Sequence, residues 1–314
     1  MGILKSQLGY GCSSLMGRIS ERESLRILEC AYDHGIRHFD VARSYGYGQA
    51  ERALGKFLQN RRESVTVTTK AGFAPPRANL MFSAARGVAR IVASLAPKLK
   101  PLFRRGAAGM VKRVATTPEF LRVSLETSLR ELGVDRVEIL LLHGCQAEEL
   151  ANPELLEFLE SAVRAGRVGR FGIGTDLKNI PDLITQRSEF LQVLQFENNP
   201  LVRSMERLDL PHGTLPITHR AIGTAGVSFL RLLGLNPSLE KACSDEISLD
   251  LSNSTLVSNL FLAYSMEQNP SGAVLFSTLN PEHLASNARL MSGSRPYSMV
   301  QFRLLEEMVN RVIA

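Results

Sequence analysis

Four side chains of types that can act together in proton transfer stand at or just after three short apolar runs. Asp40 ends the first run, Lys70 the second and His143 the third, and Tyr45 follows five residues after Asp40. A phenol with an ordinary pKa of about 10 is a poor acid at neutral pH. A nearby ammonium group stabilises the phenolate and lowers this pKa, and a carboxylate keeps the ammonium charged and oriented. Such a set could protonate a carbonyl oxygen.

Carbonyl reduction would place two further demands on the protein. The imidazole of His143 can hydrogen-bond the carbonyl and set its orientation. No side chain supplies hydride, so a nicotinamide cofactor would be required. Each residue also has an ordinary structural interpretation: Asp40 as a turn former, Lys70 as a solvated charge, His143 as a core imidazole and Tyr45 as loop packing. Their occurrence on three neighbouring units favours chemistry.

These residues lie in a regular alternation of strand and helix signals. Short apolar or β-branched runs predict strands over residues 8–12, 36–41, 64–69, 137–142, 168–173, 191–196, 215–218 and 273–276. Amphipathic stretches with cap and stop residues predict helices over 21–34, 49–59, 118–132, 153–165, 252–268 and 281–291, with a short helix from 180 and a last one from 297.

About eight strand-then-helix units in a chain of this length predict an α/β fold, a closed (β/α)₈ TIM barrel. In such a barrel, catalytic groups lie where the strands end, as these four do. The alternative is a doubly wound open sheet, which predicts a Gly-rich phosphate turn after the first strand. The run LGYGCSSLMG has glycines but no GxGxxG pattern, so the barrel is favoured.

Several motifs resemble those of the aldo-keto reductase family. FDVARSYGYGQAERALG is similar to the family signature FDTA..YG.G..E..LG, TTKAG to TKxG, and LLLHG to LLLH. Carried over position by position, Asp40, Tyr45, Lys70 and His143 match the family's catalytic tetrad, with Tyr45 as proton donor. The resemblance implies NAD(P)H-dependent, reversible reduction of an aldehyde or ketone to an alcohol.

The resemblance also implies a cofactor site, with departures at its nicotinamide end. GRVGRFGIGTD is similar to GKxRxIGVSN, with Gly174 at the serine and Thr175 at the asparagine. Gln195 matches the glutamine that holds the carboxamide. THRAIG stands where the family has AYSPLG, so His219 replaces the aromatic ring that stacks on the nicotinamide. These departures leave a second interpretation open, a cofactor-binding sensor or regulatory protein with slow turnover.

At the other end of this site, LFSTLNPEHLASN is similar to KSVTPERIAEN. Asn287 is retained, whereas Ser277 and His283 replace the basic pair that grips the 2′-phosphate in many members. The implied cofactor is NADPH, with NADH as the alternative. The full set of expected cofactor contacts is Cys12, Thr175, Gln195, His219, Arg220, Ser277, Thr278, His283 and Asn287.

A basic segment at about 73–116, after the third strand, distinguishes this chain from the family that it resembles. Between Ala71 and Thr117 there are nine basic residues and no acidic one, so the rest of the 314-residue chain carries a formal charge near −3 although the whole carries +6. Its Arg and apolar residues are spaced for an amphipathic helix. Three interpretations stay open: a surface insertion without a ligand, a lid over the site, and a contact with an anionic membrane surface or acidic partner.

Composition sets the remaining expectations. A single barrel domain over 1–314 accounts for the length. The four cysteines lie far apart with no CxxC, so no metal site is expected. No run of 18 apolar residues occurs and the N-terminus lacks a signal pattern, which predicts a cytoplasmic protein. A small-molecule carbonyl substrate, no nucleic acid, and a monomer or weak oligomer complete these expectations.

Overall fold

Eight parallel strands close into a barrel in the computed structural model, which describes residues 4–75, 112–292 and 296–313. Each strand pairs in parallel with two neighbours, in the order β1-β10-β9-β8-β7-β6-β3-β2, and β2 returns to β1 to complete the circle. The strands are β1 Leu8–Gly11, β2 His38–Asp40, β3 Thr66–Ala71, β6 Val137–His143, β7 Val168–Gly174, β8 Val193–Glu197, β9 Leu215–His219 and β10 Ala273–Phe276.

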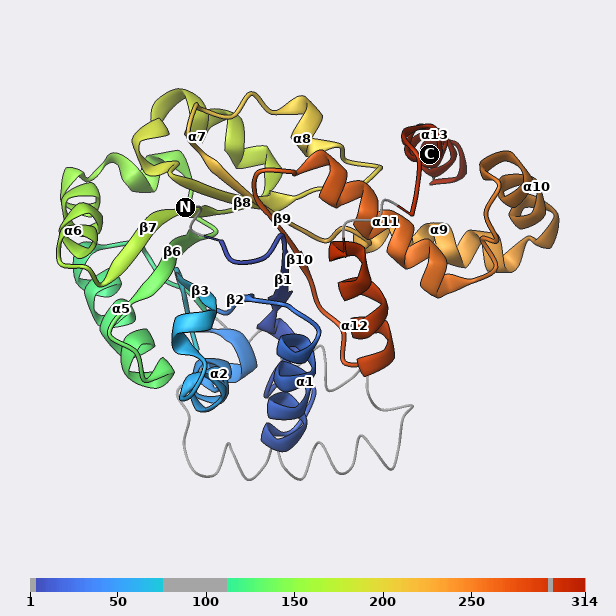
Figure 1. Ribbon diagram of the computed structural model, residues 1–314. Helices are drawn as coiled ribbons and strands as arrows, with labels where there is room; N and C mark the ends of the chain where they lie inside the picture. Colours follow the sequence, from blue (N-terminus) through green and yellow to red (C-terminus); the bar gives the residue numbers. More distant parts are fainter. Residues whose placement is uncertain (1–3, 76–111, 293–295, 314) are drawn as a thin grey trace.

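Helices follow the strands and cover the outside of the barrel (Figure 1). They are α1 Glu21–Asp33, α2 Ala50–Leu58, α5 Pro118–Leu132, α6 Pro153–Arg164, α7 Ile180–Gln186, α8 Ser204–Arg207, α9 Gly223–Leu235, α10 Pro237–Ile247, α11 Ser254–Gln268, α12 Pro281–Ala288 and α13 Met299–Ile313. None of the helices in these described ranges is long and apolar enough to cross a membrane.

Local sequence signals explain where the helices begin and end. Ser20 and Glu23 form a capping box at the start of α1. The Ser20 side chain accepts a hydrogen bond from the Glu23 amide, and the Glu23 side chain accepts one from the Ser20 amide. The Thr117 side chain accepts a hydrogen bond from the Phe120 amide at the start of α5. That helix ends at Gly133, whose left-handed φ of 65° few other residues adopt.

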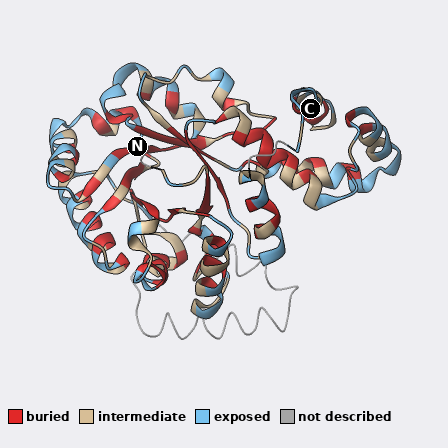
Figure 2. Ribbon diagram, viewed as in Figure 1, coloured by how far each residue is buried: buried red, intermediate tan, exposed pale blue. Residues whose placement is uncertain are grey.

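Alternation along the strands divides the core into an inner and an outer part. Inside the barrel, one apolar cluster consists of Ile139, Leu141, Val193, Ile217, Ala273 and Leu275. Outside it, Phe39, Val67, Leu140 and Leu142 pack against Phe57 of α2 and other helix residues. Figure 2 shows the buried strands ringed by helices with buried inner and exposed outer faces. His38, Asp40, Thr68 and Lys70 alternate with the outward residues, and therefore point inward.

A second apolar cluster lies beside the barrel, where α9, α10 and α13 pack together and against α11 (Figure 1). Its buried members include Phe229, Ile247, Phe261, Phe302 and Leu305. No element was expected between the strand at 215–218 and the helix from 252, so α9 and α10 are additions to the expected fold. The apolar residues of α9 do not form one stripe, since Phe229 and Leu233 are buried whereas Val227 and Leu235 are exposed.

The closed barrel expected from the sequence is confirmed, and the open sheet is excluded by the β1–β2 and β1–β10 pairings. Strand bounds shift by up to two residues; Lys70 lies within β3 rather than after it. At the base of the basic segment, β4 Phe73–Ala74 pairs antiparallel with β5 Lys112–Arg113, which the sequence did not predict. The amphipathic helix expected within this segment lies at 76–111, outside the described residues.

Two helical glycines give a matched test of close packing. A Cβ at Gly55 of α2 would lie 2.6 Å from the Glu131 carbonyl oxygen and 2.8 Å from that of Leu132, whereas a Cβ at Gly234 of α9 meets nothing within 4 Å. We expect Gly55→Ala to lower the free energy of unfolding by about 1–3 kcal/mol, because backbone atoms must move. Gly234→Ala should raise it by up to about 1 kcal/mol through helix propensity. Urea unfolding of both variants measures this; equal effects would contradict the helix contact.

The imidazole of His38 should make stability depend on pH. Burial in the barrel interior, beside Thr66 Oγ1 at 2.9 Å, lowers its pKa to about 4. The unfolded chain, with a histidine pKa of about 6.5, then binds a proton that the folded chain does not, so the free energy of unfolding should fall as the pH drops from about 6.5 towards 4. His38→Asn should reduce this slope. An unchanged slope in His38→Asn would contradict the assignment.

Candidate active site

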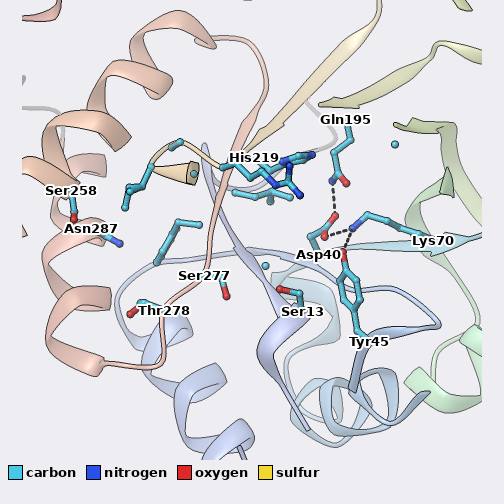
Figure 3. A pocket seen from close by; sticks show the side chains of 18 of the residues that line it. Ser13, Asp40, Tyr45, Lys70, Gln195, His219, Ser258, Ser277, Thr278 and Asn287 are labelled. Atoms are coloured by element: carbon cyan, nitrogen blue, oxygen red, sulfur yellow. Dashed lines mark hydrogen bonds and ion pairs between the residues drawn. The ribbon is translucent and has the colours of Figure 1, made fainter. Parts of the chain in front are cut away.

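A cavity of about 690 Å³ opens at the carboxyl ends of the barrel strands. Asp40, Tyr45, Lys70 and His143 line one end of it, and Ser277, Thr278, His283 and Asn287 line the other. Figure 3 shows Asp40, Tyr45, Lys70 and Gln195 gathered on one side and Ser258, Ser277, Thr278 and Asn287 on the opposite side. The cavity is therefore elongated, with Asp40, Lys70 and Tyr45 at one end and Ser258, Thr278 and Asn287 at the other.

The charged centre of this cavity is a buried ion pair between Lys70 and Asp40. Their side chains are 1% and 3% exposed, and Lys70 Nζ donates directly to Asp40 Oδ1. Lys70 Nζ also donates to the Tyr45 hydroxyl oxygen, at 3.1 Å. An ammonium group has no acceptor, so the phenol must be the acceptor in this contact. The phenolic hydrogen of Tyr45 is consequently left for another partner.

Burial and charge act in opposite directions on the pKa values of this group. Burial disfavours the charged form of Lys70, but the carboxylate of Asp40 favours it by more. The pKa of Lys70 is therefore raised above its ordinary value, and the amine is protonated. For Tyr45, burial raises the pKa of the phenol, and the attraction of Lys70 lowers it by less. The expectation of a lowered Tyr45 pKa is therefore wrong in its net direction: desolvation of the phenolate outweighs the cation.

His143 ends β6 beside the phenol. Its ring lies edge-on to Tyr45 at 6.3 Å between centroids and edge-on to Phe73 at 4.8 Å. Burial, and then the positive charge of Lys70, lower its pKa to about 3. The imidazole is thus neutral at physiological pH, with one nitrogen that donates and one that accepts a hydrogen bond.

Tight backbone turns bring these side chains together. Gly46, Tyr47 and Gly48 follow Tyr45 with φ values of 57°, 59° and 87°, all in the left-handed region. A Cβ at Gly46 would lie 2.6 Å from the Leu15 carbonyl oxygen. Only glycine therefore allows the Tyr45 loop to approach the chain after β1 this closely.

The nicotinamide end predicted from the sequence adjoins the ion pair. Gln195 of β8 is 4% exposed and donates from Nε2 to Asp40 Oδ2, at 2.7 Å. Gly174 lies beside it: a Cβ there would be 3.4 Å from Gln195 Oε1. The Thr175 hydroxyl donates to the Cys145 carbonyl at 3.1 Å and accepts from Asn179 Nδ2 at 2.9 Å. The side chains of Gln195 and Thr175 thus line the cavity and are hydrogen-bonded to other groups of the protein.

His219 and Arg220 stand at the end of β9, facing the same cavity. Burial and the charge of Lys70 lower the pKa of His219 to about 4, so this imidazole is neutral too. Arg220 has a left-handed φ of 55° and pairs with Glu197 Oε2 at 3.1 Å, with its own side chain 63% exposed. The guanidinium therefore lies near the surface and can contact an anion from there.

Every expected cofactor residue except Cys12 lines the cavity. The Cys12 side chain is fully buried in the outer core, with its thiol 3.7 Å from the Tyr10 carbonyl oxygen, and the adjacent Gly11 and Ser13 take its place in the wall. The expectation for Cys12 is corrected accordingly. Burial raises its pKa, so the thiol is neutral.

Sequence analysis did not identify Ser13, Phe73 and Ser258 as wall residues. Ser13 follows β1 and Phe73 follows β3, and the rule that barrel sites form after strands could have found both. Ser258 lies on α11 and has no such signal, because its place depends on how that helix packs. No cluster of three metal-ligating side chains occurs within 4–75, 112–292 and 296–313.

The donor set of the cavity fits a dinucleotide cofactor. Hydroxyl and amide groups occupy the end formed by β10, α11 and α12, where Ser258, Thr278 and Asn287 line the cavity (Figure 3). The hydroxyl and amide groups of these lining residues can hold ribose and phosphate oxygens. Gly11 and Gly174 add no side chain to the wall, which leaves room for a flat ring against the strand ends. A nicotinamide and an adenosine could thus lie along one continuous cavity.

Comparison with solved structures supports the fold. An aldo-keto reductase from Bacillus halodurans in its holo form superposes with a TM-score of 0.69 at 16% identity, over 96% of this chain and 91% of that one. One from Klebsiella pneumoniae in complex with NADPH superposes with a TM-score of 0.61 at 19% identity, over 98% and 90%.

Sequence comparison adds the family. D-threo-aldose 1-dehydrogenase of Pseudomonas sp is 31% identical over 192 residues, which are 55% of this chain and 51% of that enzyme. This chain thus spans about half the length of that curated relative. The model of the aldo/keto reductase family matches residues 7–217, well over half of the chain and including the ion pair, Tyr45 and His143. The chain belongs to the aldo/keto reductase family.

Proposed function

We propose that this protein reduces an aldehyde or ketone to an alcohol, reversibly, with a reduced nicotinamide cofactor and with Tyr45 as general acid. The observation that carries the proposal is the contact of the Tyr45 hydroxyl oxygen with Lys70 Nζ, at 3.1 Å, in a buried site. This contact leaves the phenolic hydrogen available to a substrate oxygen. It also places a fixed positive charge beside the phenolate that proton transfer creates.

Each member of the tetrad has a distinct part in the proposed proton transfer. When hydride arrives at the carbonyl carbon, the π electron pair moves to oxygen, which takes the proton of Tyr45. The phenolate that remains is stabilised by Lys70, and Asp40 keeps Lys70 protonated and oriented. Because burial raises the Tyr45 pKa, the phenol stays protonated at neutral pH, and Lys70 brings it closer to the range of an effective acid.

His143 is proposed to orient the substrate. As a neutral imidazole with its ring near the Tyr45 phenol, it can donate a hydrogen bond to the carbonyl oxygen without competing as an acid. Phe73 also stands edge-on to His143 and provides an apolar part of the cavity wall. The carbonyl would thus lie between Tyr45 and His143.

The cofactor proposed is NADPH or NADH. Gln195, Thr175 and His219 would hold its nicotinamide end, and Ser277, Thr278, His283 and Asn287, with Arg220, its phosphates and adenosine. When bound, it supplies the hydride that no side chain can provide. A relative of the same fold was solved in complex with NADPH, which supports a cofactor of this class.

A sensor with slow turnover is the second candidate function. Gly174 offers no side-chain donor, and the hydroxyl of Thr175 already bonds to Cys145 and Asn179. Fewer free groups would then orient the nicotinamide. Turnover with simple aldehydes, measured as cofactor oxidation, distinguishes the two: cofactor binding without turnover would favour the sensor.

Tyr45→Phe tests the proton donor. We expect the reduction rate to fall by about 100-fold or more, the usual size of a general acid contribution. Cofactor affinity should barely change, because the ring remains. Tyr47→Phe, in the same loop but outside the cavity wall, is the matched control and should keep a near-normal rate. Stopped-flow hydride transfer measures both variants; a retained rate in Tyr45→Phe would remove this residue from its role.

Lys70→Met and Asp40→Asn test whether the ion pair acts as one unit. Since Lys70 lowers the Tyr45 pKa, its loss should reduce the rate and move the basic limb of the pH–rate profile upward. Adding Asp40→Asn to Lys70→Met should cost less than Asp40→Asn costs alone. The comparison uses kcat/KM from pH 6 to 11 across the four proteins, about the range in which phenols and amines titrate. Additive losses would show that the two groups do not interact.

A further inference from the structure

We infer that Glu51 is a positioning residue for proton transfer: its buried carboxylate joins the strand that carries Lys70 to the loop that carries Tyr45. Glu51 lies in the first turn of α2 and its side chain is 1% exposed. Oε1 accepts a hydrogen bond from the Thr69 hydroxyl at 2.6 Å, and Oε2 pairs with Arg43 Nη1 at 2.8 Å. Glu51 would thus hold the Tyr45 hydroxyl in its position beside Lys70. The expected effect of Glu51 on the reaction rate rests on the proposed function.

The two partners of Glu51 flank the proton-transfer pair along the chain. Thr69 precedes Lys70 directly, and Arg43 precedes Tyr45 by two residues. The Arg43 amide also donates to the Lys70 carbonyl at 3.3 Å. One carboxylate therefore fixes β3 and the Tyr45 loop at the same point, close to where Lys70 Nζ meets the phenol.

Glu51 acts from outside the barrel. Successive strand residues point to opposite faces, so Thr69 faces the helices while Lys70 faces the cavity. Glu51 is not part of the cavity wall and neither is Arg43. The carboxylate can reach substrate or cofactor only through the backbone, which separates a positioning role from a catalytic one.

The Tyr45 loop needs such an attachment. Its residues Gly46, Tyr47 and Gly48 have left-handed φ values, which regular hydrogen-bonded structure does not maintain. The Arg43–Glu51 pair is largely removed from water, with Arg43 16% exposed. In that setting a charge-assisted hydrogen bond is strong, and losing one partner leaves the other charge buried without compensation. The pair therefore holds the loop in one arrangement.

Kinetics of paired variants test the inference. Glu51→Gln and Thr69→Val should lower the hydride-transfer rate about 10- to 100-fold, the effect of a small misplacement of a reacting group. The dissociation constant of the cofactor, from tyrosine fluorescence, should stay within about twofold, in the range expected when its contacts are intact. In a Tyr45→Phe background, the further loss from Glu51→Gln should vanish. A full further loss in that background would overturn the inference.

Two control variants separate positioning from general stability. Arg52 follows Glu51 in α2, and its exposed side chain forms an ion pair with Glu131 in which Nε and Oε2 are 3.4 Å apart. Arg52→Gln removes this ion pair and should leave the rate unchanged. Thr69→Ser keeps the hydroxyl and should restore most of the rate lost in Thr69→Val. A rate that follows thermal stability across all four variants, instead of the hydroxyl and the carboxylate, would contradict the assignment.

NMR spectroscopy tests the role of Glu51 without requiring any enzymatic turnover. With ¹³Cζ-labelled tyrosine, the Tyr45 resonance is identified by its loss in Tyr45→Phe. It should move in Glu51→Gln and Thr69→Val, and remain in place in Arg52→Gln and Thr69→Ser. An unmoved resonance in the first two variants would overturn the inference. Absence of carbonyl reduction by the unmodified protein would instead reject the proposed function, and the resonance would still decide the role of Glu51.

Discussion

The ion pair of Lys70 and Asp40 is the constraint on which the rest of the site depends. An ammonium group inside a barrel is costly to desolvate unless it is paired and its hydrogens are accepted. Asp40 supplies the negative charge, and the Tyr45 oxygen accepts a second hydrogen bond. The other carboxylate oxygen accepts from Gln195. Satisfying one buried charge thus determines where the phenol and the amide must lie, and these are the groups that the proposed chemistry uses.

Closure of the barrel makes this pairing available. Register places Asp40 beside Thr68, two residues before Lys70 on the neighbouring strand, and both Asp40 and Lys70 point inward, so that Lys70 Nζ reaches Asp40 Oδ1. Apolar residues such as Leu141 and Ile217 fill the barrel interior around this pair. They exclude water, which strengthens the attraction between Lys70 and Asp40 and also raises the pKa of Tyr45. The same burial therefore supports the ion pair and opposes ionisation of the phenol, and Lys70 offsets only part of the second effect.

The sequence was sufficient to predict the barrel and the gathering of Asp40, Lys70 and Tyr45 at one end of it, because both depend on local signals. The strand runs that lead to Asp40, Lys70 and His143 are short and either apolar or β-branched, and their carboxyl ends meet at the same end of the barrel. Long-range packing was not accessible in this way. The apolar residues of α9 do not form one stripe, so no periodic pattern marked this helix, and Ser258 reaches the cavity only through the placement of α11. Cys12 was misplaced because its backbone follows β1 while its side chain turns into the outer core. The net pKa of Tyr45 likewise depends on burial that a sequence does not show.

The contacts of Glu51 could be identified only from the folded structure. In the sequence it is one acidic position in a helix that follows the Tyr45 loop, and a surface carboxylate there would be ordinary. In the structure α2 places Glu51 within hydrogen-bond distance of the Thr69 hydroxyl and of Arg43. The proposed site therefore has two buried carboxylates on opposite faces of β3. Asp40 sets the charge of Lys70 from inside the barrel, and Glu51 sets the position of the Tyr45 loop from outside it. Proton transfer between fixed partners requires both, because a phenol of suitable acidity is effective only where the substrate oxygen meets its hydrogen.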